Sequence, residues 1–120
     1  MTPERSSTIP TREELLSHHP VLTDIVTRLV QAFHPERIYL FGSQARGEGT
    51  AESDFDLLMV VSESPLPRYR RDQDAFRVLH GVGASKDVVV FTREEFDRKR
   101  TVVCSLPATV EREGVLLYAA

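Results

Sequence analysis

The most regular pattern of apolar positions lies between Pro20 and Phe33. Apolar residues recur there at intervals of three and four, at Leu22, Ile25, Val26, Leu29, Val30 and Phe33. This spacing places them on one face of an α-helix. Pro20 suits the first turn of such a helix, and Pro35 ends it. The pattern therefore predicts an amphipathic helix that packs on a sheet.

Short β-rich runs alternate with helical patterns along the rest of the chain. The run from Asp54 to Val61 is apolar on both faces beyond Asp56, which is typical of a central strand. Pro65 and Pro67 then interrupt the chain. The four predicted strands cover residues 38–41, 54–61, 86–91 and 115–118.

The predicted helices have recognisable starts and stops. Capping boxes begin at Thr11 and Thr92, each with a glutamate three residues later, and the first helix should stop before Pro20. Tyr69, Phe76 and Leu79 fall on one helical face, and the last helix covers 107–113 and stops at Gly114. Residues 101–106 fit neither pattern. The alternation predicts an α/β (α+β) fold, with a mixed sheet of about four strands covered by helices.

Length and composition agree with a single small domain. The 120 residues suffice for one domain, expected at 11–120 after a loose leader at 1–10. No apolar run is long enough to cross a bilayer, and the first residues do not resemble a signal peptide. The single cysteine, Cys104, is expected to be a small core residue and fits a cytoplasmic location.

Charge argues against direct nucleic-acid binding. The net charge is −3, whereas a dedicated nucleic-acid binder normally carries a basic excess. Four arginines fall between Arg68 and Arg77, but Asp72 and Asp74 are interleaved with them. We interpret that segment as a solvated helix face. The histidines are not expected to act in catalysis.

The first candidate for chemistry is Gly42-Ser43, at the end of a predicted strand. Glycine lets the backbone approach a ligand closely. A helix beginning after Ser43 would direct free N–H groups towards the same loop, which is a suitable site for phosphate. The Ser43 hydroxyl could add a hydrogen bond. Arg46 could contact phosphate as well, or could simply be exposed.

Carboxylates form the second candidate feature. Asp54 and Asp56 are two positions apart, so in a strand they project to one face with Cα atoms roughly 6.6 Å apart. Such a pair can share Mg²⁺ ions, which prefer oxygen ligands. Asp87, near the start of another strand, offers a third carboxylate. Three carboxylates holding two metals would suit in-line phosphoryl transfer, although Asp87 alone is equally typical of a solvated strand start.

These motifs resemble a known family. Gly42-Ser43, ten intervening residues and then Asp54-x-Asp56 are similar to the signature of the DNA polymerase β-like nucleotidyltransferase superfamily. The surrounding residues look like its smallest branch, the minimal nucleotidyltransferases. The resemblance covers roughly residues 20–118 and is sharpest over 38–61.

The resemblance implies a function and a set of roles. Gly42 and Ser43 would hold the triphosphate of ATP, with Arg46 as a further candidate. Asp54, Asp56 and Asp87 would ligate Mg²⁺ as the catalytic acids, with two ions expected. Minimal members are often antitoxins that adenylylate and so neutralise HEPN-type ribonuclease toxins, which makes a hetero-oligomer with such a toxin the expected assembly. The alternatives are a non-catalytic, nucleotide-binding antitoxin that acts by occlusion and nucleotidyl transfer to a small molecule.

Overall fold

The protein is described here by a computed structural model, which describes residues 10–49 and 54–120. Residues 1–9, most of the predicted leader, lie outside the described residues, as do residues 50–53. None of the helices in the described ranges is long and apolar enough to cross a membrane. In chain order the elements are α2 (Arg12–His18), α3 (Pro20–Phe33), β1 (Arg37–Phe41), β2 (Phe55–Val61), α4 (Arg68–Val78), β3 (Lys86–Thr92), α5 (Arg93–Lys99), α6 (Leu106–Glu113) and β4 (Val115–Ala119).

The four strands form one mixed sheet in the order β3-β2-β1-β4. Strand β1 runs antiparallel to β2 and to β4, whereas β2 and β3 are parallel and are joined through α4. The α+β fold, the number of strands and the interior position of β2 therefore confirm the prediction. Strands β3 and β4 are the two edges of the sheet.

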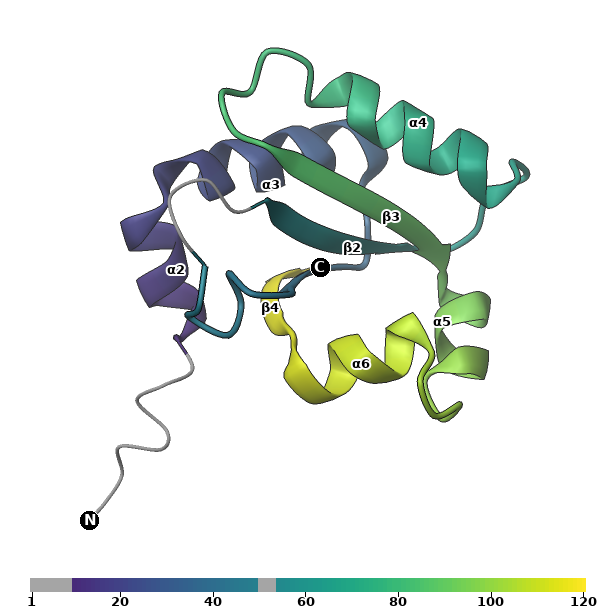
Figure 1. Cartoon of the computed structure of the whole chain (residues 1–120). Helices are drawn as coiled ribbons and strands as arrows, with labels where there is room; N and C mark the ends of the chain where they lie inside the picture. Colours follow the sequence, from purple (N-terminus) through teal and green to yellow (C-terminus); the bar gives the residue numbers. More distant parts are fainter. Residues whose placement is uncertain (1–9, 50–53) are drawn as a thin grey trace.

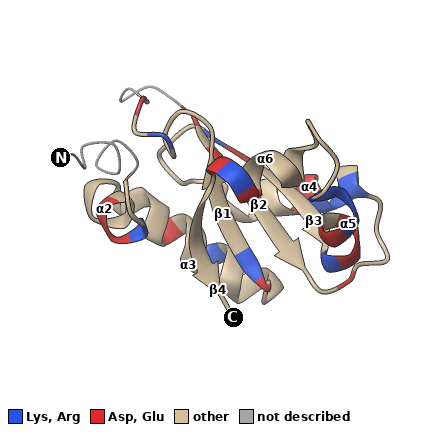
Figure 2. Cartoon of the chain, turned by 90° about the horizontal axis from the view of Figure 1, so that it is seen from below, with Lys and Arg blue, Asp and Glu red and all other residues tan. Residues whose placement is uncertain are grey.

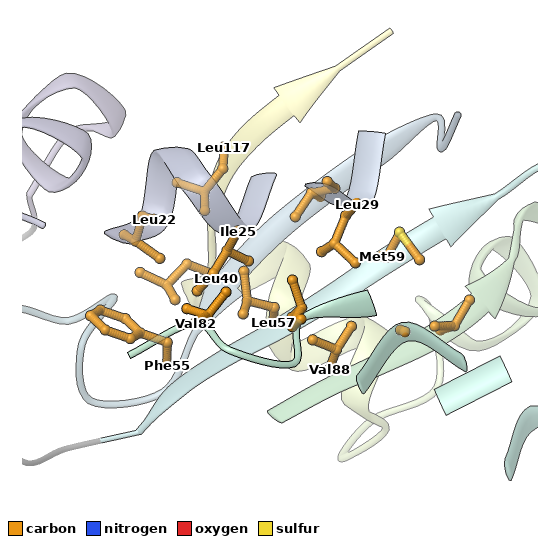
Figure 3. Close-up of a cluster of buried hydrophobic side chains, with 14 of the residues drawn as sticks. Leu22, Ile25, Leu29, Leu40, Phe55, Leu57, Met59, Val82, Val88 and Leu117 are labelled. Atoms are coloured by element: carbon orange, nitrogen blue, oxygen red, sulfur yellow. The ribbon is translucent and has the colours of Figure 1, made fainter. Parts of the chain in front are cut away.

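Helices cover both faces of the sheet (Figure 1). Helices α3 and α4 lie over one face, and α5 and α6 lie over the other. The predicted stripe of α3 is confirmed, since Leu22, Ile25 and Leu29 are fully buried and point towards Leu40 and Leu57 of the sheet (Figure 3). On the opposite face Tyr39, Leu58, Val60 and Phe91 pack with Phe96 of α5 and Val110 of α6.

Local signals set the helix starts where they were predicted. The Thr11 hydroxyl accepts a hydrogen bond from the Glu14 N–H, and Glu14 accepts one from the Thr11 N–H, so the capping box is complete. Thr92 and Glu95 form the same arrangement at α5. These interactions involve residues three apart, which is why the sequence alone predicts them.

The interpretation of the arginine-rich helix as a solvated face was wrong for Arg71. Its side chain is buried and donates to both carboxylate oxygens of Glu95, at 2.8 and 2.9 Å, and to the carbonyl oxygen of Val90 at 2.9 Å. Asp72 accepts the Val90 N–H at 2.8 Å. Because β3 is an edge strand, the outward backbone groups of Val90 need partners, and α4 supplies them. Figure 2 shows basic and acidic segments mixed along α4, α5 and α6.

Two further expectations about side chains were not met. Cys104 is exposed rather than in the core and has a φ of 72° in the turn between α5 and α6. That turn runs over the surface, so neither the sheet nor a helix covers it. Tyr69 and Phe76 of α4 are 64% and 57% exposed, unlike Leu79, which is buried.

Candidate functional site

The turn after β1 takes the place of the predicted helix. The carbonyl of Gly42 accepts from the N–H groups of Ala45 and Arg46, at 3.1 and 3.2 Å, as in one helical turn. Gly47 then adopts a φ of 76°, and the Glu48 N–H donates back to the Ser43 carbonyl at 2.9 Å. This is the pattern that closes the C-terminus of a helix, so the turn ends before a helix is established. Residues 43–47 form turns only.

Gly42 lies directly against the carboxylate of Asp56. Its φ is 81°, in the left-handed region, and a Cβ atom built on it would lie 2.5 Å from Oδ2 of Asp56. The contact follows from the sheet, because Phe41, the neighbour of Gly42, pairs with Asp56 across β1 and β2. The backbone conformation therefore favours glycine here, and a side chain at this position would displace the Asp56 carboxylate.

The sheet places two of the three predicted aspartates side by side. Asp56 on β2 pairs with Asp87 on the parallel neighbour β3, so the two side chains share a face of the sheet. That face also carries Leu58 and Val60, which α5 and α6 cover further along. Asp54 immediately precedes β2, one residue outside the strand predicted to include it, and is exposed.

The neighbouring carboxylates act on the ionisation of Asp56. Burial raises the pKa of Asp56, and the charges of Asp54 and of Asp87 raise it further. Asp56 is half-buried, whereas Asp54 and Asp87 are exposed. A cation at this position would relieve the repulsion and favour the ionised form of Asp56.

The donor set suits a hard cation. Carboxylate oxygens are the ligands that Mg²⁺ prefers, and Mg²⁺ commonly uses only one or two of them together with water and substrate phosphates. Within residues 10–49 and 54–120, no group of three His, Cys, Asp or Glu side chains is gathered closely enough to hold a metal ion. The protein groups fit a site that a phosphate-bearing ligand would complete.

Ser43 and Arg46 lie on the turn in different surroundings. Ser43 is half-buried, and its N–H donates to no acceptor among the described residues. Arg46 is paired with Glu48 at 3.0 Å and lies 3.9 Å from Glu113. Arg46 would have to exchange these partners to bind phosphate.

Sequence reasoning missed the contribution of α4. Burial raises the pKa of Asp72, and nearby Asp87 raises it further, while the Val90 N–H, Arg68 and Arg71 lower it. Asp72 is therefore a fourth carboxylate near the site, held through β3. One side of α4 faces inward and carries the buried residues Arg71, Ala75 and Leu79. Their spacing of four residues was the signal in the sequence.

Comparison with known proteins identifies the family of the chain. A family model described as a nucleotidyltransferase domain matches residues 21–116. A protein of Methanocaldococcus jannaschii, provisionally named a protein adenylyltransferase, is 31% identical over 80 residues, which cover 67% of this chain and 76% of that protein.

Solved structures share the fold. A Sulfolobus solfataricus protein, provisionally named a nucleotidyltransferase, aligns with a TM-score of 0.62 at 25% identity over 89% of this chain and 85% of its own. The MntA–HepT toxin–antitoxin structure aligns with a TM-score of 0.55 at 20% identity over 85% and 73%. A toxin–antitoxin structure with AMP-PNP gives 0.52 at 22% over 81% and 73%. With its match to the family model over most of its length, the chain belongs to the nucleotidyltransferase-domain family.

Proposed function

We propose that this chain transfers AMP from ATP to a hydroxyl group of a partner protein in a Mg²⁺-dependent reaction. The observation that carries the proposal is the pairing of Asp56 with Asp87 across β2 and β3, directly beside the Gly42 turn. Family membership supports nucleotidyl transfer as the reaction of the chain. The name of the Methanocaldococcus jannaschii relative supports a protein as acceptor.

Each group has a role in the proposed reaction. The Ser43 hydroxyl and N–H would donate to triphosphate oxygens, and the absence of a side chain on Gly42 would let those oxygens approach. Asp54, Asp56 and Asp87 would hold Mg²⁺, which when bound neutralises charge on the triphosphate. Arg46 is a further phosphate contact once it leaves Glu48.

The reaction exchanges one P–O bond for another and moves one proton. The acceptor oxygen forms a bond to the α-phosphorus of ATP, the bond from that phosphorus to the bridging oxygen of the β-phosphate breaks, and pyrophosphate leaves. The hydroxyl proton passes to the Asp87 carboxylate and then to solvent. Asp87 is exposed and so can exchange that proton with water.

The partner we propose is a HEPN-type ribonuclease toxin, with this chain as its antitoxin. The sequence resemblance to minimal nucleotidyltransferases supports this, and so does the presence of toxin–antitoxin complexes among the proteins of the same fold. AMP-PNP in one of those complexes supports ATP as the nucleotide.

Intact-mass measurement tests the proposal. The purified chain is incubated with ATP, Mg²⁺ and the protein encoded by the neighbouring gene, and that protein should gain the mass of one AMP group. The Asp54→Asn/Asp56→Asn double variant is the control and should leave its mass unchanged. If the wild-type chain binds the partner without changing its mass, the catalytic proposal is wrong and neutralisation by occlusion replaces it.

A further inference from the structure

A pocket of about 560 Å³ adjoins the candidate site beyond the edge of the sheet. It lies between α4 and β3, and Asp87 forms part of its wall. Phe76 and Val88 make its lining partly apolar, while Arg77 and His80 contribute polar groups. Phe76 is 57% exposed, so its ring is accessible from the pocket.

The order of the strands indicates which substrate this pocket could bind. The Gly42 turn follows β1, Asp54 and Asp56 belong to the β2 region, and Asp87 lies on β3. The pocket beside β3 is therefore separated from the Gly42 turn by the aspartates. In an in-line transfer the attacking and leaving oxygens lie on opposite sides of the phosphorus. If pyrophosphate leaves on the side of the Gly42 turn, the acceptor must enter from the side of Asp87.

The edge of β3 is open where it meets this pocket. The Ser85 carbonyl accepts the Phe55 N–H at 3.0 Å, so alternate residues from Ser85 onwards turn their backbone groups to β2. Val88 and Val90 consequently turn theirs outward. Arg71 and Asp72 bond to the outward groups of Val90. Among the described residues no side chain bonds to those of Val88.

We propose that this pocket docks the acceptor segment of the partner protein as an extended strand added to β3 at Val88. This inference rests on the proposed function. A polypeptide backbone supplies the donor and acceptor that the outward groups of Val88 lack. A residue of the added strand opposite Asp87 would point to the same face of the sheet as Asp87 and Asp56, which is where its hydroxyl must go.

The chemistry of the pocket favours a polypeptide over a nucleic acid as occupant. Asp72 and Asp87 line the pocket beside Arg77, whose charge is paired with Asp74 at 2.9 Å, so the lining offers no basic excess to a phosphate backbone. The side chain of Phe76 offers an apolar surface to the added segment, and the Lys86 ammonium group lies over its ring, with Nζ 5.6 Å from the ring centre. An exposed aromatic group in a pocket is a typical anchor for protein recognition.

Paired variants of α4 test the docking by kinetics. Phe76→Ala removes the pocket aromatic, whereas Tyr69→Ala removes an aromatic on the same helix that is 64% exposed and does not line the pocket. With the neighbouring gene's product as acceptor, Phe76→Ala should raise KM about tenfold with little change in kcat. Tyr69→Ala should leave both values near wild type, and both variants should bind ATP analogue as the wild type does. Equal KM values for the two variants would overturn the assignment of this pocket.

Hydrogen exchange tests the strand pairing without turnover. Adding the same partner to the wild-type chain should slow exchange of the Val88 N–H, while amides of β4, the other edge strand, should exchange at an unchanged rate. Transfer of AMP without protection of Val88 would refute the docking and leave the proposed function intact. Protection of Val88 without any transfer would support the docking and refute the catalytic proposal.

Discussion

Replacing Gly42 by alanine should separate the strain of a backbone conformation from damage to the site. Gly42 has a φ of 81°, and a Cβ atom there would lie 2.5 Å from Oδ2 of Asp56. Gly81 is a matched control, because its φ is 90° and a Cβ atom built on it meets nothing within 4 Å. Both Gly42→Ala and Gly81→Ala therefore place a side chain on a left-handed residue, but only the first meets a neighbour.

The structure gives the size of each effect. A left-handed conformation costs an alanine about 1–2 kcal/mol, so both variants should lose about that much free energy of unfolding. In Gly42→Ala the Asp56 carboxylate must also move by roughly 1 Å to reach an ordinary contact of ~3.5 Å. A misplacement of about 1 Å at a reacting group can cost about 100-fold in rate. AMP transfer should therefore fall about 100-fold in Gly42→Ala and stay near wild type in Gly81→Ala.

Urea denaturation and the transfer assay, run on the same preparations, measure the two effects. Equal transfer rates in the two variants would refute the reasoning, because the contact with Asp56 would then have no consequence. A loss of stability in Gly42→Ala far above that in Gly81→Ala would mean that Asp56 cannot move and that the contact is structural.

Three other predictions concern stability. The Asp54→Asn/Asp56→Asn double variant should melt at or above the wild-type temperature in metal-free buffer, because burial and then the charges of Asp54 and Asp87 raise the pKa of Asp56. A clear drop in a thermal melt would assign these residues a structural role. Arg71→Met should lower the free energy of unfolding in urea by about 1.5–3 kcal/mol, because Glu95 keeps only its capping contact with Thr92 and the Val90 carbonyl loses its donor, whereas Arg70→Met, at an exposed position, should have almost no effect. The hydrogen bonds from Arg71 lower the pKa of Glu95 from 4.5 to about 2, so the stability that this pair contributes is present above pH 4.5 and is lost as the pH falls towards 2. Urea denaturation between pH 2 and pH 6 should show a shallower acid loss in Glu95→Gln, and an unchanged slope would contradict this account.

The sequence predicted the features that depend on neighbouring residues. The capping boxes at Thr11 and Thr92 and the apolar stripe of α3 each lie within a single element, so their spacing sufficed. The prediction of a helix after Ser43 was wrong, although it also concerned neighbouring residues. Gly47 was visible in the sequence, but its left-handed conformation, which closes the turn, was not taken into account.

Features that depend on contacts between distant elements could not be predicted in the same way. Arg71 is buried because β3 is an edge strand with outward backbone groups, and the strand order is not readable from the pattern of the helix. Gly42 was expected to serve a ligand, yet its tightest contact is Asp56, which the antiparallel pairing brings next to it. The sequence alone could not distinguish Asp87 from an ordinary solvated aspartate, whereas the parallel register places it opposite Asp56.

Two single variants should separate nucleotide binding from transfer. Ser43→Ala should weaken binding of an ATP analogue, measured by calorimetry, by about 1.5–3 kcal/mol, the value of a hydrogen bond to a charged group. Asp87→Asn should bind the analogue nearly as the wild type does, because proton removal matters mainly in the transition state. A binding defect in Asp87→Asn as large as that in Ser43→Ala would contradict the separate roles.

The fate of a labelled phosphorus tests the central claim most directly. ATP labelled at the α-phosphorus, or in a parallel reaction at the γ-phosphorus, is incubated with Mg²⁺, the partner protein and the chain. Nucleotidyl transfer predicts that the α-label alone becomes attached to the partner and that Asp87→Asn lowers its incorporation by orders of magnitude. Incorporation of the γ-label, or incorporation of the α-label at the wild-type rate by Asp87→Asn, would contradict the account.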